Sequence, residues 1–522
     1  MKFKYFDLFT SKNDLIFREC EVCIIGAGAV GIYLASELSS QGISTVLLEA
    51  GGMECINSTD MNFDVSFEDE LYSGATKGRY FGLGGTTSHW GGVLMPHTGH
   101  DIRKMDENTF DVWQHVVDIV SSNSESVLKK LGWNEGADFS VKNGQLNKIQ
   151  KNTKISFMLD LILPFRKKNL AHLLKRLPKN NSKLTIFINS VVYDWESLLA
   201  NHEESIQTIK AKSRNNKMVE IKADKFIISA GAIESARILL ELNQSSERSI
   251  IKHTAAVGCY LTDHISLPVA NVNKASVSRV IQYFSPYFSS GWMRSFRFID
   301  DTFDYKIQRS FFHFIFENDS PGFSLAKDLL TSFQAGKLPK TKLVELFRGV
   351  FGLVQLGIYR YIYSVLYIPK NTKIHLQLDV EQYPNKENCI TLGDKLDDYG
   401  RQNIKIKWHI SDKDVSGANL ISKNFIEKWS LYEGIELDIL TDNQYLTKPY
   451  DAYHPVGTCQ MGKCEESVVD ENLKVWGVEN LWVASTGVLP SAGTANPTFT
   501  ILCLAERLSG QIINMKRYKI DK

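Results

Sequence analysis

The sequence predicts a two-domain protein in which a discontinuous, Rossmann-like α/β domain is interrupted by a second, α+β domain that contains an antiparallel sheet. Three observations predict this arrangement: a glycine-rich turn between two strand-like runs near the N-terminus, two later segments of α/β character, and a strand-like, aromatic region between those two. At 522 residues the chain is too long for one simple core, which favours two domains.

The first α/β segment has the order strand, glycine turn, helix, strand and acid. An apolar run at residues 22–25 precedes Gly-Ala-Gly-Ala-Val-Gly at 26–31, and a helix-like stretch follows at 32–38. A second apolar run at 45–48 ends in Glu49. The glycine spacing is weak evidence by itself, but in this context it predicts a dinucleotide-binding site. The alternative is a glycine-rich turn in a βαβ unit that binds no ligand.

Each glycine has a physical role in such a site. Gly26 permits the tight turn, Gly28 lets backbone N–H groups approach a pyrophosphate, and Gly31 lets the helix pack closely on the strand. The helix N-terminus offers the phosphates unpaired donors and a positive dipole end. Glu49 can accept hydrogen bonds from an adenosine ribose, which disfavours NADP but does not separate NAD from FAD.

Two later segments complete the predicted α/β domain. One contains strand-like runs at 184–188 and 226–231; the other starts at His454 and contains a strand at 481–484 and a final helix from Thr498 to about Met515. Because these segments are far apart in sequence, we expect a cofactor-binding domain formed by 1–110, 181–265 and 447–522. The substrate-binding domain would then comprise 111–180 and 266–446.

The middle region alternates apolar and polar residues at 309–316 and 374–380, which is typical of an antiparallel sheet with one covered face. We expect this sheet to cover the cofactor. The segment 346–368 is apolar and aromatic but contains Arg348, Gln355 and Arg360, so its apolar runs are too short to span a bilayer. A buried or lid-forming helix is favoured here; the alternative is a surface helix that touches a membrane or a lipid-linked substrate.

Composition excludes some classes of function. The 60 basic and 59 acidic residues give a net charge of +1, so no basic surface for nucleic acid is indicated. The first residues lack the apolar core of a signal peptide, and the eight cysteines are scattered, which favours a reducing, cytoplasmic location. No spacing of ligand residues predicts a metal site.

Two further segments carry candidate chemistry. Residues 81–92 contain five glycines among aromatic residues, which indicates backbone pressed against something flat or phosphorylated. Near the C-terminus, His454 can take a proton near neutral pH, and Asn496 is a donor that does not titrate. A strand predicted between them would let two loops at one sheet edge meet. From the residues alone, a satisfied structural histidine is the favoured interpretation of His454.

Five segments in order resemble the glucose–methanol–choline (GMC) oxidoreductases, a family of FAD-dependent enzymes that oxidise alcohols and sugars. They are residues 24–52, 83–90, 225–240, 381–392 and the C-terminal pair of segments 454–462 and 496–498. The resemblance extends over most of the chain. It implies that the dinucleotide is FAD and that the fold is the GMC fold.

The segments 480–490 and 495–498 are similar to the branch that holds pyranose 2-oxidase and bacterial sugar and polyol dehydrogenases. That branch pairs a histidine with an asparagine, and His454 and Asn496 match the pair. His89 matches the place of a histidine that is linked covalently to flavin, although a non-covalent flavin is favoured. Val192, or Val191 in the other register, resembles a valine whose backbone meets adenine.

The resemblance implies that an alcohol group of a sugar, polyol or other CH–OH substrate is oxidised to a carbonyl by hydride transfer to flavin N5. His454 would be the base and Asn496 its hydrogen-bonding partner. The predicted cofactor-binding residues are Gly26, Gly28, Ala29, Gly31, Glu49, Ala50, Gly84, Gly85, Thr86, Ser88, His89, Trp90, Val192, Ala230, Gly231, Ser485, Thr486, Pro497 and Thr498.

Several alternatives stay open. The family also holds lyases and other non-redox flavin enzymes, a flavin-binding scaffold is conceivable, and the apolar segment suggests a peripheral membrane enzyme on a lipid-linked sugar or sterol. Oxygen, a quinone or a redox protein would accept the electrons. A dehydrogenase is favoured over an oxidase, because an intracellular enzyme that makes peroxide needs special disposal. The substrate and the oligomeric state do not follow from the sequence.

Overall fold

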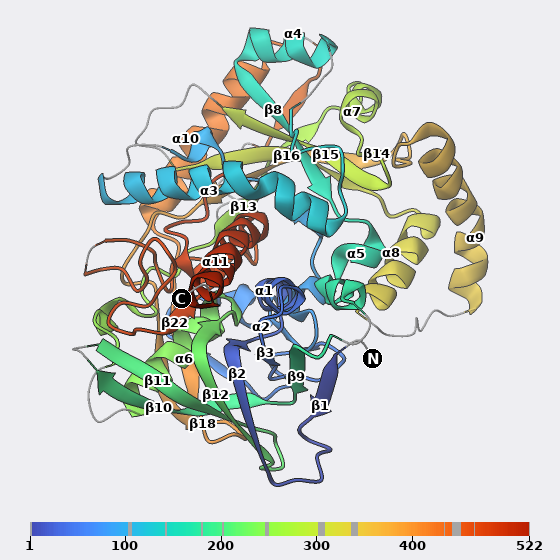
Figure 1. Ribbon diagram of the computed structural model, residues 1–522. Helices are drawn as coiled ribbons and strands as arrows, with labels where there is room; N and C mark the ends of the chain where they lie inside the picture. The colour runs from blue at the N-terminus through green and yellow to red at the C-terminus, as the bar shows by residue number, and fades with distance from the viewer. Residues whose placement is uncertain are drawn as a thin grey trace.

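The computed structural model describes residues 3–102, 107–140, 144–178, 181–200, 203–245, 250–300, 308–335, 343–432, 434–440, 450–463 and 465–520. Two large sheets organise it (Figure 1). The first lies in the lower part of that view and the second in the upper part, with helices packed around and between them.

The first sheet has eight strands, and its central strands are parallel. Its order is β1 (Lys4–Asp7), β9 (Leu184–Ile188), β3 (Thr45–Leu48), β2 (Leu15–Ile25), β12 (Met218–Ile228), β11 (Glu203–Lys212) and β10 (Val191–Ala200), with β22 (Leu481–Val483) also paired to β12. The strands therefore come from three separate parts of the chain. This confirms the discontinuous α/β fold expected from the sequence.

The second sheet has nine strands, all paired antiparallel. Its order is β20 (Leu437–Ile439), β13 (His264–Val272), β17 (Lys373–Glu381), β16 (Ser310–Glu317), β15 (Trp292–Asp300), β8 (Ile155–Ile162) and β7 (Val93–Leu94), with β14 (Tyr287–Ser289) on β15 and β21 (Tyr450–Asp451) on β13. The alternating patterns in β16 and β17 thus form strands, as predicted.

Smaller elements complete the structure. A three-stranded sheet joins β18 (Cys389–Leu396), β19 (Gln402–Lys407) and β5 (Val65–Phe67), and a two-stranded one joins β4 (Ile56–Asn57) and β6 (Tyr80–Phe81). The α-helices are α1 (Ala29–Ser40), α2 (Ser73–Thr76), α3 (Glu107–Leu131), α4 (Gly144–Thr153), α5 (Phe165–Lys168), α6 (Gly231–Ser245), α7 (Val277–Phe284), α8 (Pro321–Gln334), α9 (Leu343–Ile358), α10 (Asp412–Trp429) and α11 (Pro497–Ile520). The short helices are η1 (Gly85–Ser88), η2 (Gly99–Asp101), η3 (Leu170–Arg176), η4 (Thr254–Ala256), η5 (Tyr359–Tyr363) and η6 (Thr486–Val488).

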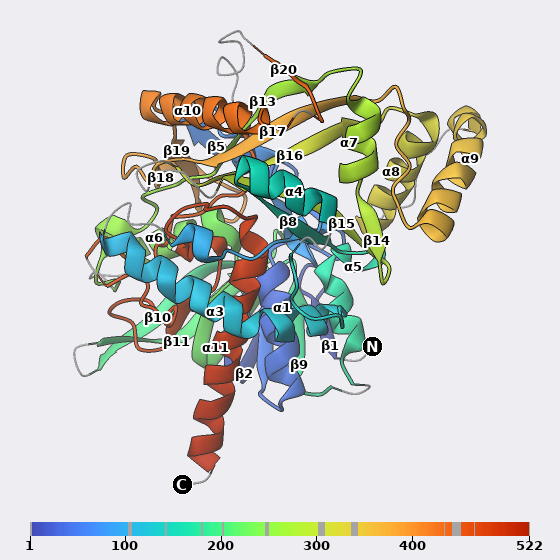
Figure 2. The same cartoon turned by 90° about the horizontal axis from the view of Figure 1, so that it is seen from above.

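Helix α1 packs against the first sheet, α11 packs on α1, and α3 packs on α11 (Figures 1 and 2). Nearly every side chain of α1 is buried, because the helix lies between the sheet and α11. The second sheet has its own core, in which Phe298 of β15 packs against Phe425 of α10 among other aromatic rings. Each sheet thus has a covered apolar face, which two-layer packing requires.

The predicted division at residue 111 differs from the packing. Helix α3, which begins near that boundary, packs on α11, and its buried Trp113 and Leu128 belong to the core of the first sheet. The boundary at 446/447 lies outside the described residues, and the one at 180/181 lies at their edge. The domain limits therefore stay a prediction.

Residues 346–363 of the segment 346–368 are helical. Of the favoured expectation of a buried or lid-forming helix, the buried helix is wrong and the lid stays a prediction. Helix α9 runs to Ile358 and continues into the π-helix η5. Phe351 is 84% exposed and Tyr361 is 81% exposed. The reason is position, because α8 and α9 form a pair at the outer edge of the molecule (Figure 2) and α8 covers one side of α9.

Candidate active site

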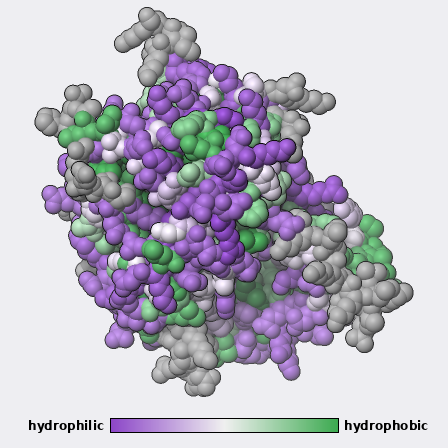
Figure 3. All heavy atoms as spheres, turned by 90° about the horizontal axis from the view of Figure 1, so that it is seen from below, coloured by the Kyte–Doolittle hydropathy of each residue, from purple (hydrophilic) through white to green (hydrophobic). Residues whose placement is uncertain are grey.

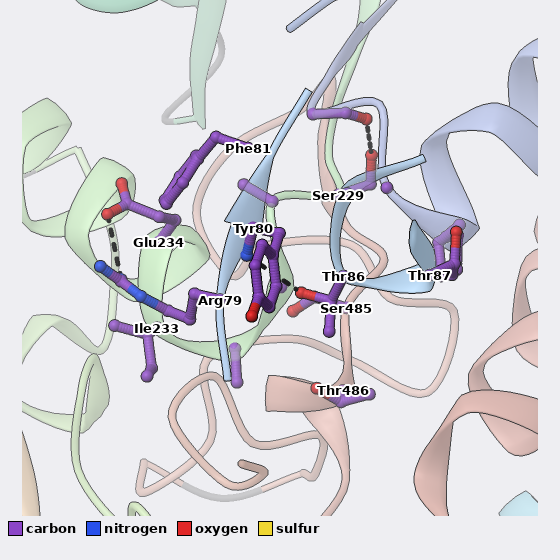
Figure 4. Close-up of a pocket in the computed structure, with 18 of the residues that line it drawn as sticks. Arg79, Tyr80, Phe81, Thr86, Thr87, Ser229, Ile233, Glu234, Ser485 and Thr486 are labelled. Carbon is purple, nitrogen blue, oxygen red and sulfur yellow. Dashed lines mark hydrogen bonds and ion pairs between the residues drawn. The ribbon is translucent and has the colours of Figure 1, made fainter. Parts of the chain in front are cut away.

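A cavity of about 560 Å³ lies where the first sheet meets the second. The glycine turn, residues 77–93, the start of β10, the junction of β12 with α6, and the start of α11 all line it. Figure 4 shows Tyr80, Ser229 and Thr486 converging on it from different elements. The parallel strands β2 and β12 end at this cavity, which is the usual ligand position in an open α/β sheet.

The glycine turn has the geometry that the sequence predicts. A Cβ on Gly31 would lie 1.9 Å from the carbonyl oxygen of Gly26, so only glycine allows α1 to pack here. Gly26 has a φ of 100°. A Cβ on Gly28, in contrast, would meet no protein atom within 4 Å and would occupy the cavity. Helix α1 starts at Ala29 without a side-chain cap or an acid in its first turn, so its N-terminus is available to an anion.

Glu49 stabilises the same turn. Its carboxylate accepts hydrogen bonds from the backbone N–H groups of Ala27 at 2.7 Å, Gly51 at 2.9 Å and Gly82 at 2.8 Å. Burial raises the pKa of Glu49, while these three donors act in the opposite direction. Glu49 also lines the cavity, so its predicted contact with a ribose stays a prediction.

The second glycine loop packs directly on the first. The N–H of Gly84 donates to the carbonyl of Ala27 at 2.9 Å. The hydroxyl of Ser88 bonds to the carbonyl of Gly85 at 2.7 Å and lies 2.7 Å from Nδ1 of His89. The His89 ring stacks on Tyr80, with ring centroids 3.6 Å apart. His89 is thus held flat at the cavity wall.

Most of the predicted cofactor residues line this cavity. The exceptions are Gly31, Gly84 and Ser88, which do not line the cavity but pack within the glycine turn and the second glycine loop. Val191 and Val192 both line it, so both registers weighed for the adenine contact stay open. The lining residues that sequence reasoning missed include Phe63, Arg79, Tyr80, Arg401 and Tyr453.

Arg79 belongs to a buried ion cluster at the cavity wall (Figure 4). Its guanidinium lies 3.2 Å from Glu234, which also pairs with Arg401 at 3.4 Å and Arg237 at 3.6 Å. Burial alone would raise the pKa of Glu234, but the three arginines lower it to about 2. Arg237 and Arg401 also pair with Glu241 and Asp397, so the cluster balances its charges and holds the guanidinium of Arg79 at the cavity wall.

Two buried polar atoms among the described lining residues have no protein partner. They are Nη2 of Arg79 and the hydroxyl of Ser485. Buried donors are normally satisfied, so these atoms fit a bound group that carries acceptors. Together with the open Gly28 position and the uncapped helix, they show that the cavity fits a dinucleotide with a pyrophosphate.

The structure brings His454 and Asn496 together at the other end of the cavity. Nε2 of His454 lies 2.9 Å from Nδ2 of Asn496. His454 follows β21, and its backbone N–H donates to Asp263 at 2.9 Å. Asn496 immediately precedes α11. Both line the cavity, so the predicted meeting of two loops occurs.

A second histidine determines which nitrogen of His454 carries the hydrogen. Nε2 of His264 lies 2.9 Å from the carbonyl of Gly493, and a carbonyl only accepts. Neutral His264 must therefore donate from Nε2 and accept at Nδ1. That Nδ1 lies 3.2 Å from Nδ1 of His454, so His454 donates from Nδ1 and keeps a lone pair on Nε2.

An arginine closes this chain of hydrogen bonds at the other end. Nη2 of Arg297 donates to Oδ1 of Asn496, which leaves Nδ2 to face His454. Nε of Arg297 lies 2.6 Å from Asp160, and the guanidinium stacks over Phe311 at 3.9 Å. Arg297 is 4% exposed. The amide orientation of Asn496 is thus set by a buried, paired cation.

Burial lowers the pKa of His454 to about 3. That value includes the effects of the neighbouring His264 and Arg297, which also lower the pKa, and of Asp379, which opposes them. His454 is therefore neutral and able to accept a proton throughout the usual pH range. Asp263, His264 and His454 have ligand atoms within 4.8 Å of one another, but these atoms are engaged in the hydrogen bonds just described.

The comparisons with known proteins agree with this geometry. Residues 384–505 match the family model for GMC oxidoreductase, and residues 19–58 match a model for an FAD binding domain. The chain is 31% identical over 134 residues to 2-methyl-1,2-propanediol dehydrogenase of Mycolicibacterium austroafricanum, covering 25% of this chain and 24% of that protein. It is 41% identical over 71 residues to choline oxidase of Arthrobacter globiformis, covering 13% of each. These matches thus span a quarter or less of either relative.

A solved structure covers the whole fold. Pyridoxine 4-oxidase from Mesorbium loti superposes with a TM-score of 0.58 over 94% of this chain and 99% of that one, at 15% identity. Such a likeness concerns the fold alone. The two family models and the related segments support membership of the GMC oxidoreductase family and FAD as the cofactor.

Proposed function

We propose that this protein oxidises an alcohol group to a carbonyl. The observation that carries the proposal is the His454–Asn496 pair, 2.9 Å apart at the wall of a cavity whose other end fits the pyrophosphate of FAD. Relatives named for oxidising 2-methyl-1,2-propanediol, choline and long-chain alcohols support the class of reaction.

Bound FAD would supply the acceptor for the two electrons and the hydrogen that leave the substrate carbon. The residues of this chain that would hold it are the glycine turn with Glu49, the loop from Gly85 to Trp90, Arg79, and Ser485 with Thr486.

His454 accepts the hydroxyl proton of the substrate at Nε2. Two hydrogen bonds of the His454 ring, from Nδ1 to His264 and at Nε2 with Asn496, fix the ring so that Nε2 faces the cavity. When the alcohol binds, its oxygen replaces the direct contact between His454 and Asn496. Removal of the O–H proton makes the carbon a better hydride donor, because negative charge develops on the oxygen.

Asn496 stabilises that charge. Its Nδ2 donates to the substrate oxygen, while its Oδ1 stays bonded to Arg297. A cation bonded to the amide oxygen strengthens the donor on the amide nitrogen, and the buried site makes this effect larger than it would be in water. Asp160 in turn holds Arg297 in place.

The substrate class proposed from the resemblance is a sugar, polyol or other small CH–OH compound. The cofactor is proposed to be non-covalent, because Nδ1 of His89 is engaged by Ser88 and its ring is stacked on Tyr80. Acid precipitation of the purified protein tests this: a colourless pellet under a yellow supernatant supports it, and a yellow pellet contradicts it.

The electron acceptor is proposed to be other than oxygen, so that the enzyme is a dehydrogenase. The relatives include both oxidases and dehydrogenases, so only the reaction itself decides. Turnover with an artificial quinone acceptor and little hydrogen peroxide in air supports a dehydrogenase. Stoichiometric peroxide would make the protein an oxidase.

The experiment that tests the proposed reaction is anaerobic mixing of the FAD-loaded protein with a panel of sugars, polyols, sterols and aliphatic alcohols. A substrate should bleach the flavin absorbance and yield one carbonyl for each flavin. Conversion of a compound without bleaching would point instead to a lyase or another non-redox flavin enzyme, and would overturn the proposal.

A further inference from the structure

The outer surface of α9 and η5 is unusually apolar. Phe351, Tyr361 and Ile362 are 84%, 81% and 70% exposed. The other exposed members of this surface are Val350, Val354, Ile358 and Tyr363. We call these seven residues the apolar face. Figure 3 shows hydrophobic side chains at the right-hand edge of the molecule, the side on which Figure 1 places α9.

The apolar face is one side of a helix, not a scatter of residues. Val350, Val354, Ile358 and Ile362 follow one another at intervals of four, so they form one stripe. The opposite side of α9 packs on α8 through glycines. A Cβ on Gly352 would lie 2.7 Å from Cα of Gly322. This close backbone packing fixes the orientation of α9 and keeps the stripe outward.

The stretch of sequence that carries the apolar face contains basic residues and no acidic ones. No aspartate or glutamate occurs between Glu345 and Asp379, a stretch that contains Arg360, Lys370 and Lys373. The guanidinium of Arg360 stacks over Phe288 at 4.4 Å, at the border of the face. Basic residues beside an exposed apolar stripe fit an anionic surface.

Tyrosines border the same face. The ring of Tyr359 lies 5.3 Å from that of Tyr363 and 4.7 Å from that of Tyr367. Tyr361, in the same segment, is exposed to solvent. Tyrosine is enriched where hydrocarbon meets lipid headgroups, because its ring is apolar and its hydroxyl is polar. No described helix is long and apolar enough to cross a membrane, so this helix would lie along the surface of a bilayer.

These observations lead us to propose that the apolar face docks the protein onto an anionic lipid bilayer. Phe351, Val354 and Ile362 enter the boundary of the acyl chains, while Arg360 contacts acidic headgroups. A second copy of the chain fits this face less well. A symmetric pair would bring the same cations together with no acid from this stretch to neutralise them.

Docking would also hold the wall of the cavity close to the bilayer. Helix α8 ends at Gln334, whose side-chain amide donates to the carbonyls of Thr87 at 3.1 Å and Trp90 at 2.9 Å. Thr87 and Trp90 line the cavity. The helix pair that carries the apolar face is thus attached to a loop of the cavity wall, so a docked protein would hold this loop close to the bilayer.

Flotation of the FAD-loaded, full-length protein with lipid vesicles tests the proposal. We expect it to float with vesicles of phosphatidylcholine mixed with phosphatidylglycerol, and less with phosphatidylcholine alone. The double variant Phe351→Asp/Ile362→Asp should lower the partition coefficient at least about tenfold, because apolar burial drives insertion. Arg360→Glu should weaken binding to the anionic vesicles and leave binding to neutral ones unchanged.

The matched control is Leu198→Asp/Leu396→Asp. These leucines are 60% and 66% exposed, and they belong to β10 and β18, away from the apolar face. The control should float as the unaltered protein does, and all variants should keep their FAD content. Recovery of the unaltered protein from the lipid-free fraction would overturn the proposal. So would equal losses in both double variants, or concentration-dependent dimers that Phe351→Asp/Ile362→Asp abolishes while flotation persists.

Discussion

The glycine turn and the His454–Asn496 site show how differently two functional regions depend on their surroundings. At the turn, backbone atoms approach so closely that Gly31 tolerates no Cβ. At the other site, the two side chains depend on His264 and Arg297, which come from distant strands. The first kind of site is defined by local sequence, while the second is defined by side chains that only the fold assembles. The predictions below separate the two kinds.

The largest effect is expected from a methyl group in the glycine turn. Gly31→Ala places a Cβ 1.9 Å from the backbone oxygen of Gly26, so the helix must shift from the strand. We expect a loss of about 3 kcal/mol or more in the free energy of unfolding, and little FAD bound. Chemical denaturation measures the first and absorbance the second.

Gly28→Ala is the matched control for this change. Its Cβ meets no protein atom within 4 Å, so the protein should keep its stability. The methyl group occupies the cavity, however, and FAD should be retained less well than in the unaltered protein. Equal unfolding free energies for Gly31→Ala and Gly28→Ala would contradict the roles given to the two glycines.

Arg297→Gln is expected to lower the rate of flavin reduction about 10²-fold, because it removes a buried charge behind the donor on Asn496. Arg297→Lys keeps the charge and should recover part of the rate. Stopped-flow absorbance under anaerobic conditions measures both. Because Asp160 loses its partner in the first variant, FAD content and thermal stability are measured alongside. Equal rates for the two variants would show that the charge has no role.

His264→Leu should have a smaller effect, about tenfold on the same rate, because it removes one hydrogen bond that orients His454. His264→Gln can donate to the carbonyl of Gly493 and also accept from His454, so it should be faster than the leucine variant. KM should change little in either. A leucine variant as fast as the unaltered protein would remove His264 from the proposed mechanism.

The smallest effect expected is that of mild acid on the unaltered enzyme. Burial holds the pKa of His454 at about 3, below its ordinary value of 6.5, so the base stays unprotonated when the pH falls below 6.5. The flavin-reduction rate should therefore be level between about pH 5 and pH 8. The unfolded chain takes up a proton near pH 6.5, so His454 lowers stability as the pH falls from there toward 3. A rate that halves near pH 6.5 would contradict the low pKa.

The parts that the sequence predicted correctly are those in which a residue type is required locally. The strands β3 and β9, the turn after β2 and the antiparallel middle sheet follow from apolar runs, glycines and alternation. The exposure of α9 could not be predicted, because the sequence shows an apolar helix without showing that α8 covers only one side of it.

The candidate site was predicted in part for the same reason. His454 and Asn496 stand in segments with family resemblance, whereas His264 begins an ordinary strand and shows no pattern of its own. Arg297 did give a signal, since an arginine stands among aromatic residues in a strand whose neighbours are buried. Its contact with Asn496 depends on how the second sheet meets α11, which local sequence does not contain.

The most direct test of the proposed site is single-turnover flavin reduction in FAD-loaded His454→Ala, with the alcohol that bleaches the unaltered protein. The rate should fall about 10²- to 10⁴-fold while FAD content stays the same, because the base is lost and the glycine turn is intact. A rate within about twofold of the unaltered protein would show that His454 does not accept the substrate proton.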